Sequence, residues 1–185
     1  MKTARTITTC ILAAAFAAAC SSTPSGRLDR MYASLQEDVA EHGHETEPDK
    51  ALLERHAHRA EEVREMVAKG QVTKGMDKFH AAVLLVENGA TEDLKLAEQL
   101  AMQSADQGVE LGRRVAAEAI DKQLVRQHLP QRYGTQYEWV PVLRAWRLYP
   151  IDPKTTDSDR RAMGVPSLVE IRAGEERLNA SVPKK

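Results

Sequence analysis

The stretch MDKFHAAVLLVENGATEDLKLAEQLAMQSADQGVELGRRVAAEA, residues 76–119, decides the fold. Its apolar residues recur every three or four positions, and this spacing is typical of amphipathic helices. The small residues among them allow helix axes to approach closely. We predict three successive helices: about 76–88, about 91–105 and about 110–128.

The ends of these helices carry recognisable signals. Asn88-Gly89 is a C-terminal cap signal, because glycine adopts the left-handed backbone that often ends a helix. Thr91 is expected to cap the next helix, which Gly108 ends. Pro130 ends the third helix. Short connections of this kind predict that neighbouring helices run antiparallel.

Helices are also predicted upstream of this stretch. Residues 28–42 have apolar side chains at helical spacing, and His42-Gly43-His44 ends the segment. Pro48 starts a second helix that Lys69-Gly70 ends. Its expected apolar stripe is Leu53, Ala57, Ala60, Val63 and Val67.

The pattern changes after Pro130. Residues 135–140 and 144–151 are β-prone runs around a turn that contains Pro141, and they predict a hairpin. Thr156 is expected to cap a short helix, and Ser167 with Glu170 forms a capping box that opens the last helix. The predicted fold is mainly α: antiparallel helix pairs in a tetratricopeptide-like array, with a small C-terminal β-hairpin and short terminal helices.

The N-terminus has the order of a bacterial export signal. Lys2 and Arg5 precede an uncharged run of about 13 residues, which ends in small residues before Cys20. A membrane-spanning helix needs about 20 apolar residues, so this run is too short to span.

Residues 17–20 resemble the lipobox of bacterial lipoproteins, in which the cysteine is lipidated and becomes the N-terminus. The resemblance implies a lipid on Cys20, attachment to the membrane through it, and a cell-envelope location. Ser21, in place of aspartate, resembles outer-membrane sorting, facing the periplasm or the surface. An ordinary signal peptide with an incidental Cys20 is the alternative.

Composition excludes several classes of function. The formal net charge is −1, and loss of Lys2 and Arg5 makes the remainder more acidic, so no basic footprint for nucleic acid exists. The two cysteines are Cys10 and Cys20, which lie within or at the end of the signal. No phosphate-binding loop, nucleophile elbow or His-Glu-x-x-His motif occurs, and we expect no cofactor.

Two resemblances to known families bear on the helical region. Residues 77–119 are similar to the helix pairs of tetratricopeptide and Sel-one-like repeats, over about one and a half units. Residues 54–179 resemble a bacterial family known as domain of unknown function six-six-two-four. The motifs that carry this second resemblance are Phe79-His80-Ala81-Ala82, residues 117–124, residues 131–136, residues 149–153 and residues 161–166. It implies a mostly helical domain and no activity.

The segment Gln131-Arg132-Tyr133-Gly134-Thr135-Gln136 is the most distinctive part of the chain. Gly134 permits a tight bend, and Arg132, Tyr133, Thr135 and Gln136 present four polar side chains. These four residues either orient a ligand or satisfy the backbone of a loop that follows a helix.

A second candidate site centres on His80 and Asp121. His80 lies on an apolar helical face, where a histidine is most often a core residue. If the helices that carry His80 and Asp121 pack together, the two side chains and Gln136 converge, and His80 gains a carboxylate partner and the role of a base. The pairs His42/His44 and His56/His58 are better explained as solvated segments than as metal ligands, and we expect no metal site.

These features predict a signal peptide at 1–19, a flexible tether at 20–27, a single helical domain at 28–180 and a tail at 181–185. The leading hypothesis is a lipid-anchored, non-enzymatic binding or scaffold module that uses a helical surface and the Arg132–Gln136 loop to bind an envelope protein or a small ligand. An envelope enzyme centred on His80 and Asp121 is the alternative, and a structural spacer is a third.

Overall fold

A computed structural model of the chain describes residues 23–42 and 49–182. Cys20, the export signal, Pro48 and most of the predicted tail lie outside the described residues. The elements are α2 (Pro24–His42), α3 (Lys50–Ala68), α4 (Gly75–Asn88), α5 (Thr91–Asp106), α6 (Leu111–Arg126), β1 (Tyr137–Val140), β2 (Ala145–Leu148), α7 (Asp157–Ala162) and α8 (Leu168–Ala180).

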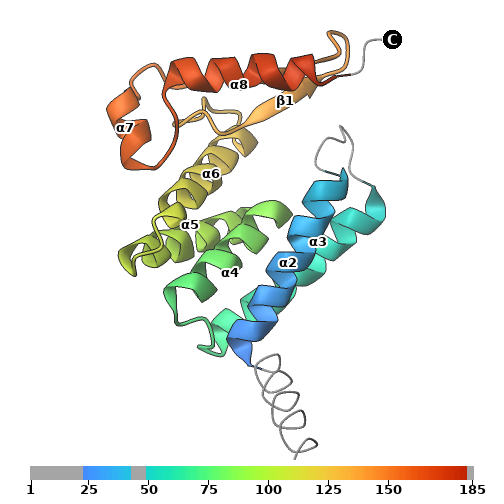
Figure 1. Ribbon diagram of the computed structural model, residues 1–185, viewed down its shortest axis with the longest axis vertical. Coiled ribbons are helices and arrows are strands. Elements are labelled where there is room, and N and C mark those ends of the chain that lie inside the picture. The colour runs from blue at the N-terminus through green and yellow to red at the C-terminus, as the bar shows by residue number, and fades with distance from the viewer. Residues whose placement is uncertain (1–22, 43–48, 183–185) are drawn as a thin grey trace, which may run out of the picture.

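The mainly helical fold with a small C-terminal hairpin is confirmed. Figure 1 shows α2 and α3 side by side, α4 and α5 next to this pair, and α6 rising towards the unit formed by the hairpin, α7 and α8. The chain therefore runs from one end of its long axis, where Pro24 begins α2, to the other. None of the helices in the described ranges is both long and apolar enough to cross a membrane.

The α4–α5–α6 layer forms where the sequence places its small residues. Gly89 ends α4 in the left-handed conformation that its cap signal predicts, with φ of 67°. Gly112 lets α6 approach α5, because a Cβ added there meets the Ser104 hydroxyl at 2.1 Å and the Ala101 carbonyl oxygen at 2.4 Å. The close approach of α5 and α6 thus depends on one residue without a side chain.

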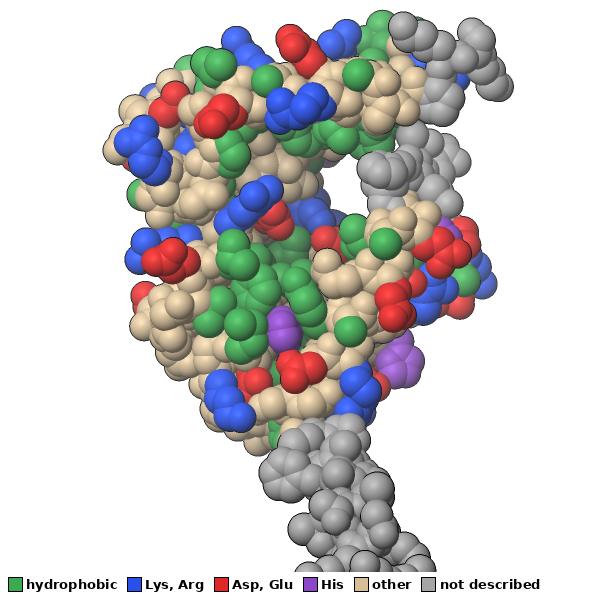
Figure 2. All heavy atoms as spheres, viewed as in Figure 1, with side chains coloured by type: hydrophobic (Ala, Val, Ile, Leu, Met, Phe, Trp, Pro, Cys, Tyr) green, Lys and Arg blue, Asp and Glu red, His purple; other side chains and the backbone are tan. Residues whose placement is uncertain are grey.

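The main hydrophobic core is formed by the five helices α2 to α6 and consists mostly of aliphatic residues, many of them alanine. Figure 2 shows apolar side chains gathered where α2 meets α4, and there Tyr32 lies 6.0 Å from the ring of Phe79. Buried polar groups pin the same helices together. Asp93 at the start of α5 accepts two hydrogen bonds from Arg64 on α3 and one from Asn88 on α4.

The structure corrects the predicted start of α2. Residues 24–27 were expected in a flexible tether, yet they form its first turn. Thr23 accepts a hydrogen bond from the Gly26 N–H through its side chain, and Pro24 suits the first turn because its N–H is not needed there. Ala90, not Thr91, is the N-cap of α5, because Thr91 is already the first helical residue, and no side chain caps this end.

The predicted stripe of α3 is confirmed in part: Ala60 and Val63 belong to the core and Val67 packs against it, whereas Leu53 and Ala57 are exposed. Leu53 is 52% exposed, whereas Leu52 and Met66 are buried. Arg59 is buried too, because its guanidinium crosses to Ser34 and Asp38 on α2. The packed face of α3 therefore includes an ion pair that an apolar pattern does not detect.

The C-terminal unit has a small hydrophobic core of its own. Ala117 on α6, Tyr133, Val165 and Ile171 on α8 form it, while Ala116 and Ala119 on the other side of α6 belong to the main core. Opposite faces of α6 thus carry both cores, and this helix joins the two parts of the molecule.

The predicted hairpin is confirmed, with shorter strands than expected. Tyr137 pairs with Leu148, and Trp139 pairs with Trp146, whose ring lies 5.7 Å away. Asn179 of α8 closes the outer edge of β2: its side chain accepts from the Trp146 N–H and donates to the Trp146 carbonyl. The hairpin is therefore fixed to α8.

Candidate functional site

The distinctive loop begins with a buried glutamine that holds the loop closed. The Gln131 side-chain amide donates to the carbonyls of Gln136 and Tyr149, and its oxygen accepts from the Gln136 N–H. The Gln131 backbone is bonded to Pro150 and Asp152 on the opposite segment. Gly134 turns the loop with φ of 93°, a conformation that favours glycine.

Asp121 fills the inside of this loop. Its carboxylate is fully buried and accepts hydrogen bonds from four consecutive N–H groups, those of Arg132 (2.7 Å), Tyr133 (2.9 Å), Gly134 (2.9 Å) and Thr135 (3.0 Å), and from the Thr135 hydroxyl (2.9 Å). Successive N–H groups that converge in this way form an anion-binding concavity. Here the anion is a side chain of the same protein.

Arg160 of α7 supports the loop from the other side and is 2% exposed. Its Nε donates to the Tyr133 carbonyl, and its Nη1 donates to the Thr155 carbonyl and to Asp157. A buried guanidinium needs acceptors for its charge and its donors, and these three acceptors satisfy Nε and Nη1.

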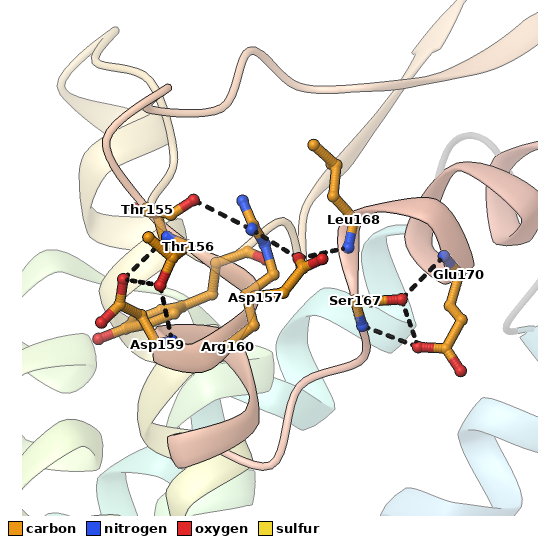
Figure 3. A network of polar contacts seen from close by, with 9 residues as sticks. Thr155, Thr156, Asp157, Asp159, Arg160, Ser167, Leu168 and Glu170 are labelled. Atoms are coloured by element: carbon orange, nitrogen blue, oxygen red, sulfur yellow. Dashed lines mark hydrogen bonds and ion pairs between the residues drawn. The ribbon is translucent and has the colours of Figure 1, made fainter.

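The network continues into α8, as Figure 3 shows. Asp157 accepts from the Leu168 N–H as well as from Arg160. The Leu168 N–H and then the Arg160 guanidinium lower the pKa of the Asp157 carboxyl below its ordinary value. The predicted Thr156 cap and the predicted Ser167–Glu170 capping box are both present, and Asp159 completes a capping box with Thr156. The loop, α7 and α8 therefore share one polar network.

Two grooves flank the loop and share Asp152. One, of about 530 Å³, lies between the segment from Leu148 to Pro153 and the face of α8 that carries Leu168 and Arg172; Arg160 also lines it. The other, of about 460 Å³, lies against the end of α6 and is lined by Ile120, Leu124, Leu129, Pro130 and Arg132. The hydrogen-bonded loop therefore lies between two grooves.

The four predicted ligand-binding residues have different environments. Tyr133 is buried in the small core, and Thr135 and Gln136 are half-buried, with the Gln136 amide donating to the Thr135 hydroxyl. Arg132 alone is exposed, with its guanidinium carbon 5.9 Å from the centre of the Tyr133 ring. Asp121 of α6 satisfies the backbone N–H groups of the loop, and Arg132 is the outward-facing charge of the loop.

Asp121 and His80 occupy separate networks. All the hydrogen bonds of the Asp121 side chain go to the loop. His80 stacks on Tyr32 of α2 with ring centres 4.2 Å apart, and its Nδ1 lies 3.1 Å from an Asp29 oxygen, outside good hydrogen-bond geometry. Burial lowers the pKa of His80, and the Asp29 charge partly offsets this effect. The structure joins Asp121 to the predicted loop and does not join His80 to either.

The remaining histidines that the structure describes do not line either groove. His56 and His58 lie on α3, and burial lowers the pKa of His56. Across the described ranges, 23–42 and 49–182, no three His, Cys, Asp or Glu side chains are grouped so as to hold a metal ion.

Sequence reasoning missed Arg160 and Arg172 as site residues and named Gln131 only as part of a motif. Asp157 and Arg160 have the i, i+3 spacing of a helical ion pair, which was the available signal for Arg160. Arg172 follows Leu168 by four residues, so the two share a helix face, but the sequence does not say what that face meets.

No family model, curated protein or solved structure matches this chain.

Proposed function

We propose that the protein is a lipid-anchored envelope protein that acts as a non-enzymatic binding or scaffold module, with its binding surface around the Arg132–Gln136 loop. The saturation of Asp121 carries this proposal. A carboxylate that already accepts from five donors has no free lone pair directed at a substrate proton. All the hydrogen bonds that this carboxylate accepts come from the loop.

The surroundings of the loop support binding. A binding surface needs fixed geometry, because ordering flexible segments costs free energy on association. Gln131, Asp121 and Arg160 fix the loop from three sides, and a groove opens on each side of it. Arg132 adds a charge, and arginine is enriched where protein surfaces bind partners.

The enzyme alternative needs His80 and Asp121 in one pocket. Each of these side chains has its own partners, on α2 and on the loop respectively. A base and an orienting carboxylate act together only within hydrogen-bond reach. This separation favours binding over catalysis.

The direction of the chain fits attachment at its N-terminal end. Pro24 begins α2 at one end of the long axis, and the hairpin and α8 lie at the other (Figure 1). A lipid on Cys20, only a few residues before Pro24, would hold the grooves away from the membrane. A lipoprotein carries two or three acyl chains, and more than one chain is needed for stable anchoring.

Site-specific crosslinking in intact envelopes tests the binding proposal. A photoreactive residue at position 132 is expected to give a discrete crosslinked species. The same residue in place of Met102, which is exposed on α5, is expected to give none and serves as the matched control. Equal crosslinking from both positions, or none from position 132, would contradict the proposal.

Incorporation of labelled fatty acid tests the anchor separately. We expect the full chain to take up the label and the Cys20→Ala variant to lose it. Cys10 is the only other cysteine, so a Cys10→Ala variant is the matched control and is expected to keep the label. Label that persists in the Cys20→Ala variant would overturn the anchor.

A further inference from the structure

The larger groove is lined by Arg160, whose guanidinium is hydrogen-bonded through two of its three nitrogens. Nε and Nη1 of Arg160 use three acceptors, and a guanidinium has five N–H donors. The two donors on Nη2 have no acceptor among the described residues, and Arg160 lines the groove. In Figure 3 Nη2 carries no dashed line and lies on the same side of the network as the Leu168 side chain.

A second arginine faces the same groove. Arg172 follows Leu168 by one turn of α8 and lines the groove with it. Within residues 23–42 and 49–182, no carboxylate lies within ion-pair distance of Arg172. It therefore has no ion-pair partner among the described residues, and it lines the same groove as Arg160.

The acidic residues at this groove already have partners. Glu175 pairs with Arg147 at 3.2 Å, and Asp152 accepts from the Lys154 N–H at 2.9 Å. Because the Lys154 N–H carries no full charge, Asp152 still repels anions, and a ligand with one negative charge meets less repulsion than a doubly charged phosphate. The uncharged part of the lining is mostly apolar and comprises Leu148, Tyr149, Pro150, Ile151, Pro153, Thr155 and Leu168.

We propose that this groove binds an apolar carboxylate, with its oxygens between Arg160 Nη2 and Arg172 and its hydrocarbon part against Ile151 and Leu168. A guanidinium matches a carboxylate in geometry as well as in charge. Arg160 is fixed before the ligand arrives, so it loses little freedom on binding. The inference rests on the proposed binding function and names the ligand class of one of its two grooves.

Two sources supply this chemistry: the free C-terminus of a peptide and a small carboxylic acid. Titration calorimetry of the full-length chain in detergent distinguishes them with four probes: acetyl-leucine, acetyl-leucine amide, and a short peptide ending in leucine with a free or an amidated C-terminus. Both acids are expected to bind about ten-fold or more tightly than their amides, because a charge-assisted hydrogen bond is lost in each amide. Tighter binding of the free peptide than of acetyl-leucine assigns the peptide as source, and equal binding assigns the small acid.

Variants of α8 test the residues. Arg172→Gln is expected to weaken acid binding about ten-fold and to leave amide binding and the Tm unchanged. Arg177→Gln, on the same helix and outside the groove, is the matched control and is expected to change neither. Arg160→Lys keeps the charge and loses Nη2. This variant is expected to weaken binding of the acids and not of the amides, and its Tm is measured alongside.

Three results would overturn the inference: equal binding of acid and amide, no binding of either acid at concentrations on the order of 10 mM, and equal effects of the Arg172 and Arg177 substitutions. If the acids do not bind while position 132 still crosslinks a partner, this inference alone fails. If the acids bind and depend on Arg172 while crosslinking fails, the proposed partner binding fails and the groove assignment stands.

Discussion

Replacement of Asp121 by Asn tests whether the loop is held by the carboxylate. The amide keeps the shape and retains one acceptor oxygen. In its less costly orientation the amide NH₂ replaces the oxygen that accepts from Arg132 and Tyr133, and it opposes their two N–H groups. A buried donor without a partner costs about 1–3 kcal/mol. We therefore expect a loss of about 2–4 kcal/mol for Asp121→Asn, and a larger loss for Asp121→Ala, which leaves four N–H groups without an acceptor.

Urea unfolding measures this loss in two parts of the molecule. Trp139 and Trp146 are the only tryptophans and both lie in the hairpin, so their fluorescence reports the C-terminal unit. Far-UV circular dichroism reports mainly the helical body. Asp106→Asn, at the exposed end of α5, is the matched control. If Asp121→Asn differs from Asp106→Asn by less than about 1 kcal/mol in the fluorescence transition, the carboxylate does not hold the loop and our reasoning fails.

Three further predictions follow from other contacts. Gly112→Ala should destabilise the helical body by at least the 1–3 kcal/mol that is typical of overpacking, because its Cβ meets Ser104 and Ala101 at less than 2.5 Å; an unchanged circular dichroism transition would refute this. Asn179→Ala should cost about 1–2 kcal/mol in the fluorescence transition, since the N–H and carbonyl of Trp146 lose their partner; a change smaller than that of Asp106→Asn would count against the closure of the β2 edge. His80 should titrate below its ordinary value of 6.5 in an NMR experiment, because burial disfavours its charged form. The unfolded chain then binds the proton first, so stability should fall as the pH drops from about 7 through 6.5, and less steeply in His80→Gln; an NMR midpoint above 6.5 would contradict the burial argument.

The fold was largely predictable because local signals agree with the packing. Asn88-Gly89 ends α4, and the two capping boxes open α7 and α8 as expected. Errors arose where the backbone conformation of one residue or a distant polar contact determines the structure. α6 ends at Arg126 rather than His128, because His128 adopts a left-handed backbone with φ of 58° that the sequence pattern does not indicate. Arg59 is buried by a partner on α2 that no periodicity identifies.

The sequence predicted several residues of the candidate site, but it did not predict which atoms of these residues contact one another. Asp121 and the Arg132–Gln136 loop were both singled out, and the structure brings them together. Which atoms of the loop face the carboxylate depends on backbone direction, and the sequence pattern does not give it. His80 was placed on an apolar face, and its proximity to Asp29 depends on how α2 crosses α4. Arg160 and Asn179 act over 27 and 33 residues, beyond any local pattern.

The position of α6 between two cores has a mechanical consequence. A pull between Pro24 and the hairpin passes through α6 and into the hydrogen bonds that the loop makes to Asp121. Those bonds end on a single carboxylate, so they carry the force together and break within a short extension. We expect the C-terminal unit to detach abruptly and as one piece under tension, which makes this joint brittle.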